Sequence, residues 1–391
     1  MKKTVILATL AATLTQAQAQ AQTETIKKIK DVVIYEDSKF YCAFPSVVKR
    51  PDGELLVAFR RAPEVRVWGE ARWTHAHPNA YQMIVRSTDG ETWTKIPEPM
   101  YAHPFGESGE PNLLQLRDGT LLSTGYGWAF IKPNGIATLK KPLFHHGDAT
   151  LLGGYLIRST DGGKSWQELP SPPHIAPEAC YSPFGDKLPA YNRGALFEGK
   201  SGRIFWAVAA MEDAAAIKTS VHLLTSDDKG LTWTYQCPIA AVTDDVSFNE
   251  TSMYETPKGD LVAFLRTDTK TSNSMGAQAH IARSTDGGKS FTCEPMGFMG
   301  HPLHALRLPD NRVLLTYGYR LPPFGIRARV LNAECTDFAT AKEFVLRDDG
   351  GNLDLGYTWS ALMEGNRALV VYYFNKSDGL RHIAGTIIEV N

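Results

Sequence analysis

Acidic, basic and aromatic side chains recur where the predicted apolar strands of this chain begin or end. The set at strand starts comprises Glu110, Arg193, Glu250, His301, His304 and Tyr357. The set at the ends of the following strands comprises Arg60, Arg61, Arg266 and Arg320. Carboxyl and imidazole groups transfer protons, and a guanidinium binds a carboxylate through two parallel hydrogen bonds. Arginines and aromatic rings that converge on one pocket suit a ligand that is rich in hydroxyl groups or bears a carboxylate.

The strands that carry these residues belong to a hairpin repeat that occurs six times. Each copy is an apolar run, a turn rich in Pro, Asp, Gly or Lys, and a second apolar run, as a β-hairpin requires. The copies begin near Phe44, Pro111, Gly194, Thr251, Leu303 and Tyr357. The repeat therefore predicts six similar β-structured units.

A second repeat, Ser-x-Asp-x-Gly-x-(Ser/Thr)-aromatic, supports the first. Full copies span residues 159–166, 226–233 and 284–291, and a copy one residue shorter spans 87–93. In each copy we expect a hairpin turn in which the Asp carboxylate caps backbone N–H groups, the Gly adopts a positive φ and the aromatic ring packs beneath. Internal repeats of this length are typical of propeller blades.

We therefore predict an all-β fold, a six-bladed β-propeller of four-stranded antiparallel blades that forms a single domain over residues 22–391. The last blade lacks one strand, and residues 26–35 (IKKIKDVVIY) are expected to supply it and close the ring. Residues 131–154 are expected to form an insertion over one face. In a propeller the inner strands begin and the second strands end on one face, so the polar residues named above should converge near the axis.

The Asp-containing turns resemble the Asp-boxes, or BNR repeats, of the sialidase (neuraminidase) superfamily, whose members are six-bladed propellers. Asn249-Glu250-Thr251 is similar to the family's Asn-Glu-Pro segment, and Gly356-Tyr357-Thr358 is similar to its nucleophile segment. The resemblance implies that Glu250 activates Tyr357 as the nucleophile, because a phenol ionises too weakly near pH 7 to react unaided. It also implies that the Asp-boxes lie on the rim and serve the fold.

The resemblance further implies a triad of arginines that holds a sugar carboxylate. Arg266, in the strand after Glu250, resembles the second member of that triad. Arg327 resembles the third, with Arg320 or Arg329 as alternatives for the same place.

The catalytic motif is incomplete at two positions. Ala43-Phe44-Pro45 stands where the family has Arg-Ile-Pro, and Arg60 or Arg61 is the candidate to supply the missing cation from the next strand. Between Gly53 and Thr88 there is no Asp to match the family's acid/base residue. His75 and His77 lie in that loop and are the predicted proton donors, since imidazole titrates near working pH.

The resulting prediction is an exported exo-glycosidase of sialidase type. It would release a terminal sialic acid or a related acidic or deoxy sugar from a glycan, with retention of configuration if Tyr357 is the nucleophile. One alternative is a glycosidase or polysaccharide lyase of different sugar specificity that works through His75, His77, His301 or His304. A second alternative is a non-catalytic propeller that binds glycans.

Composition limits the partners and the compartment. A formal net charge of −1 over 391 residues gives no electrostatic case for nucleic acid or for an anionic membrane. Residues 1–21 combine Lys2 and Lys3, a short apolar run and small residues, which predicts a cleaved export signal and a periplasmic or secreted protein without a membrane span. The five cysteines lack the spacing of a zinc site, so no metal or cofactor is predicted, and a monomer that binds a glycan is expected.

Overall fold

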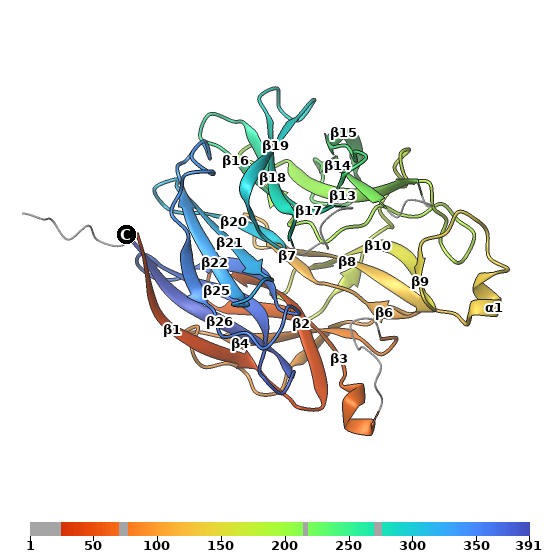
Figure 1. Cartoon of the computed structure of the whole chain (residues 1–391), viewed down its shortest axis with the longest axis horizontal. Coiled ribbons are helices and arrows are strands. Elements are labelled where there is room, and N and C mark those ends of the chain that lie inside the picture. Colours follow the sequence, from red (N-terminus) through yellow and green to blue (C-terminus); the bar gives the residue numbers. More distant parts are fainter. Residues whose placement is uncertain (1–24, 70–76, 214–217, 270–275) are drawn as a thin grey trace, which may run out of the picture.

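The computed structural model describes residues 25–69, 77–213, 218–269 and 276–391 of the chain. The predicted export signal, residues 1–21, lies outside these residues, as does His75. The fold is all-β, with six sheets arranged as the blades of a ring around which the chain runs once (Figure 1). The predicted six-bladed propeller is therefore confirmed.

The first three blades follow the chain from its N-terminal half. Blade 1 contains β2 (Phe40–Lys49), β3 (Leu55–Pro63), β4 (Tyr81–Ser87) and β5 (Glu98–Tyr101). Blade 2 contains β6 (Glu107–Ser108) and β7 (Asn112–Gln115) as its inner strands, then β8 (Leu121–Phe130), β10 (Ala149–Ser159) and β11 (Gln167–Glu168). Blade 3 contains β12 (Phe197–Glu198), β13 (Ile204–Asp213), β14 (Lys218–Ser226) and β15 (Thr234–Ala240).

The other three blades complete the ring. Blade 4 contains β16 (Val246–Glu255), β17 (Leu261–Thr269), β18 (Gln278–Ser284) and β19 (Thr292–Met299). Blade 5 contains β20 (Leu303–Arg307), β21 (Val313–Tyr319), β22 (Gly325–Leu331) and β23 (Phe344–Arg347). Blade 6 contains β24 (Gly356–Leu362), β25 (Arg367–Asn375), β26 (Arg381–Val390) and β1 (Ile26–Tyr35).

The N-terminal strand closes the ring, as its sequence predicts. β1 pairs antiparallel with β26, from Ile26 opposite Val390 to Tyr35 opposite Ile383, and thus becomes the outermost strand of blade 6 (Figure 1). Most of its middle residues are exposed, Lys27, Lys28 and Lys30 among them. Charged side chains on an edge strand oppose pairing with further chains.

Apolar side chains fill the spaces between the blades. Among the described residues, six clusters of buried residues lie one between each pair of neighbouring blades, including blades 6 and 1, and a seventh lies around Leu151 and Met211. Strands packed on both faces need unbroken apolar runs, and β13 shows this with eight consecutive buried residues from Ile204. Because one of these clusters lies between blades 6 and 1, closure of the ring buries apolar surface in the same way as the other blade contacts do.

The Asp-box turns join the third and fourth strands of blades 1 to 4. In the box of blade 2, the Asp161 carboxylate accepts hydrogen bonds from the backbone N–H groups of Lys164 and Ser165, both at 3.0 Å. The Ser159 hydroxyl donates to the same carboxylate at 2.8 Å and accepts from the Gly163 N–H. Because strand direction alternates, these turns lie on the face opposite to the starts of the inner strands.

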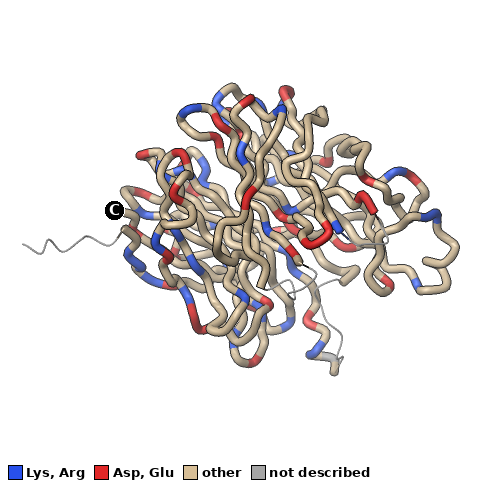
Figure 2. Tube along the Cα trace, turned by 45° about the horizontal axis from the view of Figure 1, so that its top comes forward, with Lys and Arg blue, Asp and Glu red and all other residues tan. Residues whose placement is uncertain are grey.

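Little of the chain departs from this pattern. Helix is confined, in the described residues, to η1 (Val65–Trp68) and α1 (Pro133–Ile136). α1 and β9 (His145–His146) lie between β8 and β10, within the predicted insertion, and stand at the outer edge of blade 2 (Figure 1). Basic and acidic residues are interspersed along the chain trace (Figure 2). In the part of the chain that the structure describes, no helix is both long and apolar enough to cross a membrane.

Candidate active site

Bulges at the starts of three inner strands aim the central side chains. In β2, β16 and β24 the pairing register shifts so that two residues oppose one, at Phe44, Glu250 and Tyr357 respectively. A bulge turns a side chain away from the direction that the regular strand would give it. The three blades thus present these residues at the same end of the ring.

Two of the bulged residues adopt a backbone conformation that is unusual for side chains. Phe44 has φ of 58° and Tyr357 has φ of 53°, and each such residue costs about 1–3 kcal/mol. Their rings pack edge to face, with centroids 4.7 Å apart. Gly356 permits the turn, because a Cβ at this position would lie 2.9 Å from Gly318 Cα. Backbone strain of this kind is concentrated at functional sites.

Tyr357, Glu250 and Arg266 form a hydrogen-bonded triad. The Tyr357 hydroxyl donates to Glu250 Oε1 at 2.7 Å. Arg266 Nη1 donates to Glu250 Oε1 at 3.0 Å and to the Tyr357 oxygen at 3.0 Å. The predicted base and the predicted nucleophile are therefore in direct contact and share one cation.

The protonation states in this triad follow from its surroundings. Burial opposes ionisation of Glu250, but the charge of Arg266 and the Tyr357 hydrogen bond outweigh it and hold the pKa of Glu250 below its usual value. Burial and the neighbouring Glu250 charge raise the pKa of Tyr357. The resting site thus holds a neutral phenol against an ionised carboxylate, which is the arrangement in which the carboxylate accepts the phenolic proton.

Two more arginines flank the Tyr357 ring. The Arg193 guanidinium lies 4.4 Å and the Arg320 guanidinium 5.1 Å from the ring centroid, both within cation–π distance. Arg193 also donates to the Pro45 carbonyl at 3.1 Å, and so brings a guanidinium to segment 43–45, which has no arginine of its own. Three guanidinium groups therefore surround the phenol.

Glu110 holds Arg193 in place from blade 2. Its Oε2 lies 3.2 Å from Arg193 Nε, and both side chains are buried. Burial, with a smaller contribution from Glu250, raises the pKa of Glu110 to about 8 although Arg193 opposes the shift. Glu110 is thus mostly protonated at neutral pH, which leaves the three guanidiniums with an excess of positive charge.

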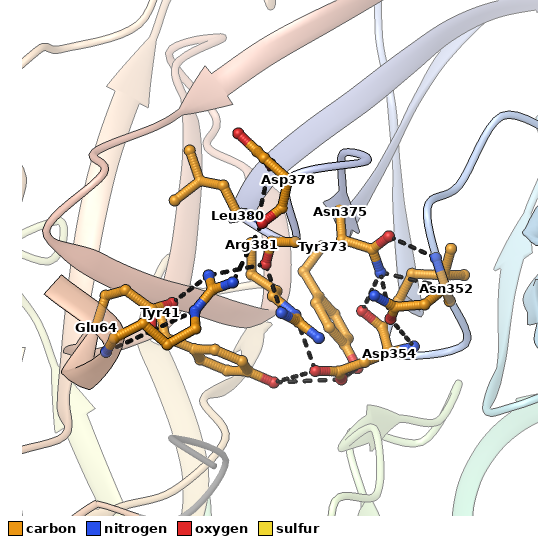
Figure 3. Close-up of polar contacts among 12 residues, drawn as sticks. Tyr41, Glu64, Asn352, Asp354, Tyr373, Asn375, Asp378, Leu380 and Arg381 are labelled. Carbon is orange, nitrogen blue, oxygen red and sulfur yellow. Dashed lines mark hydrogen bonds and ion pairs between the residues drawn. The ribbon is translucent and has the colours of Figure 1, made fainter. Parts of the chain in front are cut away.

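A buried network that includes Tyr373 orients Arg320, and Figure 3 shows the part of it around Asp354. Arg320 donates to the Leu355 carbonyl at 3.0 Å and to the Tyr373 hydroxyl at 3.1 Å. Tyr373 in turn donates to Asp354 at 2.8 Å, which also accepts from Tyr41 at 3.0 Å. The sequence prediction missed Tyr373 and Asp354, and the only signal for them was their position beside the ends of blade 6 strands.

Some predicted arginines lie elsewhere. Arg327 lies on β22, the third strand of blade 5, where it stacks over the Tyr319 ring at 4.6 Å and contacts Glu343 at 3.8 Å. The arginine of blade 5 that approaches Tyr357 is therefore Arg320 and not Arg327. Arg61 lies over the Phe40 ring at 4.2 Å.

Arg60 is buried one layer behind the site. It pairs with Glu107 at 2.7 Å, and its guanidinium lies 6.0 Å from the Phe44 ring. The guanidinium that reaches segment 43–45 therefore comes from blade 3, through Arg193, while Arg60 supports the ring that packs against Tyr357.

The predicted histidines occupy different environments. His304 stacks on Trp359 with centroids 4.6 Å apart, and burial lowers its pKa to about 3, so it is neutral at physiological pH. His301 is buried just before β20. His77 donates its backbone N–H to Glu107 at 3.2 Å, which places it beside the Arg60 pair.

The cavities of the molecule differ in their relation to this site. A cavity of about 10 Å³, enough for roughly one water molecule, lies between Arg193, Glu250 and Trp359. A far larger cleft of about 680 Å³ includes Asp89 of an Asp-box in its lining and so lies on the opposite face. We assign the site by its side-chain chemistry and not by cleft size. Within the described residues, no group of three or more His, Cys, Asp or Glu side chains is arranged to hold a metal ion.

Comparisons with known proteins agree with this architecture. A family model for a BNR repeat-like domain matches residues 143–323. A Dyadobacter fermentans protein of unknown function is 61% identical, over 94% of this chain and 100% of that chain, with a TM-score of 0.90. No curated protein matches the sequence significantly.

More distant solved structures share the fold. A Hadza microbial sialidase is 16% identical over 90% of this chain and 66% of its own, with a TM-score of 0.62. A Penicillium chrysogenum α-L-arabinanase, solved with arabinobiose, is 15% identical over 93% of this chain and 99% of its own, with a TM-score of 0.65. The chain belongs to one family with the Dyadobacter protein, and its residues 143–323 match the BNR repeat-like domain. It has the fold of glycoside hydrolases that act on different sugars.

Proposed function

We propose that this protein is an exo-glycosidase of sialidase type that cleaves a terminal acidic sugar from a glycan with retention of configuration. The observation that carries the proposal is the direct contact among Tyr357, Glu250 and Arg266. A buried, strained tyrosine hydrogen-bonded to an ionised carboxylate is the arrangement that an activated phenol nucleophile requires.

In the first step the Tyr357 oxygen attacks the anomeric carbon and Glu250 accepts the phenolic proton. The Arg266 contact at 3.0 Å stabilises the charge that develops on the oxygen, and Arg193 and Arg320 add to the positive field. Water then attacks the anomeric carbon from the face that the leaving group vacated, and the bond to the Tyr357 oxygen breaks. Two inversions at one carbon give net retention.

The charge of the site supports an acidic sugar. Three guanidiniums face the ionised Glu250, and burial raises the pKa values of Glu110 and Asp268, the other two carboxyls in contact with them, so a ligand carboxylate would meet a net positive field. Sialic acid, its deaminated analogue and uronic acids carry such a group. We also propose, on residues 1–21, that the protein is exported to the periplasm or medium and acts there as a monomer on glycans.

The test is hydrolysis of aryl glycosides by protein that lacks residues 1–21. The panel carries sialic acid, its deaminated analogue, a uronic acid, rhamnose, fucose and arabinofuranose. We expect release from an acidic sugar, and a loss of at least about 10³-fold in kcat/KM for Tyr357→Phe.

Three other outcomes of this assay would each overturn a part of the proposed function. Full activity of Tyr357→Phe would overturn the tyrosine mechanism in favour of the histidine-based alternative. Release of neutral sugars only would overturn the acidic substrate class. Saturable glycan binding without product would identify a binding propeller instead of an enzyme.

A further inference from the structure

The proposed mechanism needs a proton donor for the departing glycosidic oxygen. The blade 1 loop has no Asp between Gly53 and Thr88 to serve in this role. We propose that Asp268, on β17 of blade 4, is the residue that donates this proton and later accepts one from water. The inference rests on the proposed function and adds the catalytic acid/base to it.

Arg266 contacts both Asp268 and the Tyr357 oxygen, and so links Asp268 to the triad. The two residues are two positions apart on β17, so their side chains leave the same face of the strand. Asp268 Oδ1 lies 3.7 Å from Arg266 Nη2, while Arg266 Nη1 contacts the Tyr357 oxygen at 3.0 Å. One guanidinium therefore limits the distance between the donor and nucleophile oxygens to about 9 Å, and the separation of about 5 Å that retaining glycosidases use lies within this limit.

The exposure of Asp268 suits a donor. Its side chain is 32% exposed, against 8% for Glu250, so it stands nearer to solvent than the base does. In an exo-acting enzyme the leaving group points outward while the terminal sugar occupies the deep part of the site. A proton donor must therefore stand toward the entrance, and Asp268 does.

Burial of the Asp268 carboxyl favours its protonated form. Burial and the nearby Glu250 raise its pKa above the usual aspartate value, while Arg266 and Arg320 oppose the shift. A donor with a raised pKa keeps its proton closer to working pH.

Two other buried carboxyls near the site are held by arginines. Glu107 contacts Arg60 at 2.7 Å, and Glu110 contacts Arg193 at 3.2 Å. Both are almost completely inaccessible to solvent. Asp268 has the longer ion-pair distance and the greater exposure, which leave its carboxyl able to turn to a substrate.

The proton balance closes over the two steps. As the Tyr357 oxygen bonds to the anomeric carbon, the bond to the glycosidic oxygen breaks. The Asp268 proton moves to that oxygen, and the Tyr357 proton moves to Glu250. In the second step water gives a proton to Asp268 as its oxygen bonds to the anomeric carbon, and Tyr357 leaves and recovers its proton from Glu250.

The test compares two leaving groups on the sugar released in the panel above. A 4-nitrophenyl glycoside needs little protonation, whereas a methyl glycoside needs a full proton. For Asp268→Asn we expect kcat/KM to fall about 10²- to 10⁴-fold on the methyl glycoside. The fall in kcat/KM on the 4-nitrophenyl glycoside should be less than about tenfold, because 4-nitrophenolate leaves with little help from a proton donor.

Azide and a matched variant complete the design. Azide attacks without a general base, so it should raise 4-nitrophenyl turnover by Asp268→Asn and yield the glycosyl azide. Asp260→Asn is the control, because Asp260 forms an ion pair of 3.0 Å with Arg283 just before β17, at the other end of the strand. It should leave both rates unchanged.

Failure of the inference is distinguishable from failure of the proposed function. Equal losses on both glycosides, or no loss on either, would overturn the role of Asp268 while Tyr357→Phe remained inactive. Activity of Tyr357→Phe on both glycosides would overturn the proposed mechanism itself.

Discussion

The acidic residues of the Asp-boxes and those of the central site are held in opposite ways. Asp89, in the box of blade 1, is exposed and accepts backbone N–H groups of Glu91 and Thr92 at 2.8 and 2.7 Å. These hydrogen bonds lower its pKa to about 2. Glu110, in the centre, is buried with a pKa raised to about 8, and its cation comes from Arg193 in the next blade.

The two regions differ in the groups that stabilise each carboxylate and in how far along the chain those groups lie. An Asp-box satisfies its carboxylate with backbone groups a few residues away, so the turn is complete within one hairpin. In the centre, the Glu250–Arg266 pair lies within blade 4, but the cation of Glu110 comes from blade 3, and Arg320 and Tyr357 join the group from blades 5 and 6. The box therefore serves stability, and the centre holds groups whose charges can respond to a ligand.

Removal of a central cation should have the largest effect on stability. Arg266→Met leaves the ionised Glu250 buried without its ion pair, which we expect to lower the free energy of unfolding by about 3–5 kcal/mol. Urea denaturation at pH 7 measures this change. The double variant Arg266→Met/Glu250→Gln should recover most of the loss, since no buried charge then remains.

The matched variant is Arg203→Met, which removes the partner of Asp227 in the Asp-box of blade 3. Arg203 contacts Asp227 at 2.8 Å, and both side chains are exposed, so water replaces the lost partner and no measurable change is expected. Similar losses for Arg203→Met and Arg266→Met would show that the two regions do not differ as described.

An intermediate effect is expected from Glu110 as a function of pH. Its pKa is about 8 when folded and near 4.5 when unfolded, so the folded state binds the extra proton between these values. The stability of the protein relative to Glu110→Gln should therefore be highest below about pH 4.5 and fall as pH rises toward 8. Urea unfolding of both proteins at pH 5 and pH 8 tests the sign, and a difference that does not change with pH would contradict the assignment.

The smallest effect is expected from a single Asp-box. Asp89→Ala removes a carboxylate cap on two backbone N–H groups, which should cost about 1 kcal/mol at pH 7. Because the folded pKa of Asp89 is lowered to about 2, this contribution should be lost as pH falls through that value. Thermal unfolding measures the cost, and kcat/KM should stay unchanged. A loss of activity without a change in stability would contradict this prediction and show that the Asp-box takes part in function.

Position in the repeat also predicted that polar residues from different blades would meet near the axis. Glu250 and Tyr357 were expected to meet because both stand where inner strands begin, and they do so at 2.7 Å. Position alone did not separate Arg60 from Arg61, because successive residues of a strand point to opposite faces. Arg60 lies behind the Phe44 ring and Arg61 lies over Phe40.

The sequence by itself determined the features that depend on neighbouring residues or on a repeating pattern. These are the six hairpins, the Asp-box turns and the closing strand at residues 26–35, because apolar alternation and turn residues act over a few positions. Only the tertiary structure decided that Arg193 and Arg320 flank Tyr357, that Arg327 does not, and that Asp268 shares Arg266 with the triad. Bulges direct the Glu250 and Tyr357 side chains to this group, and burial among the packed blades raises the pKa values of Tyr357 and Asp268.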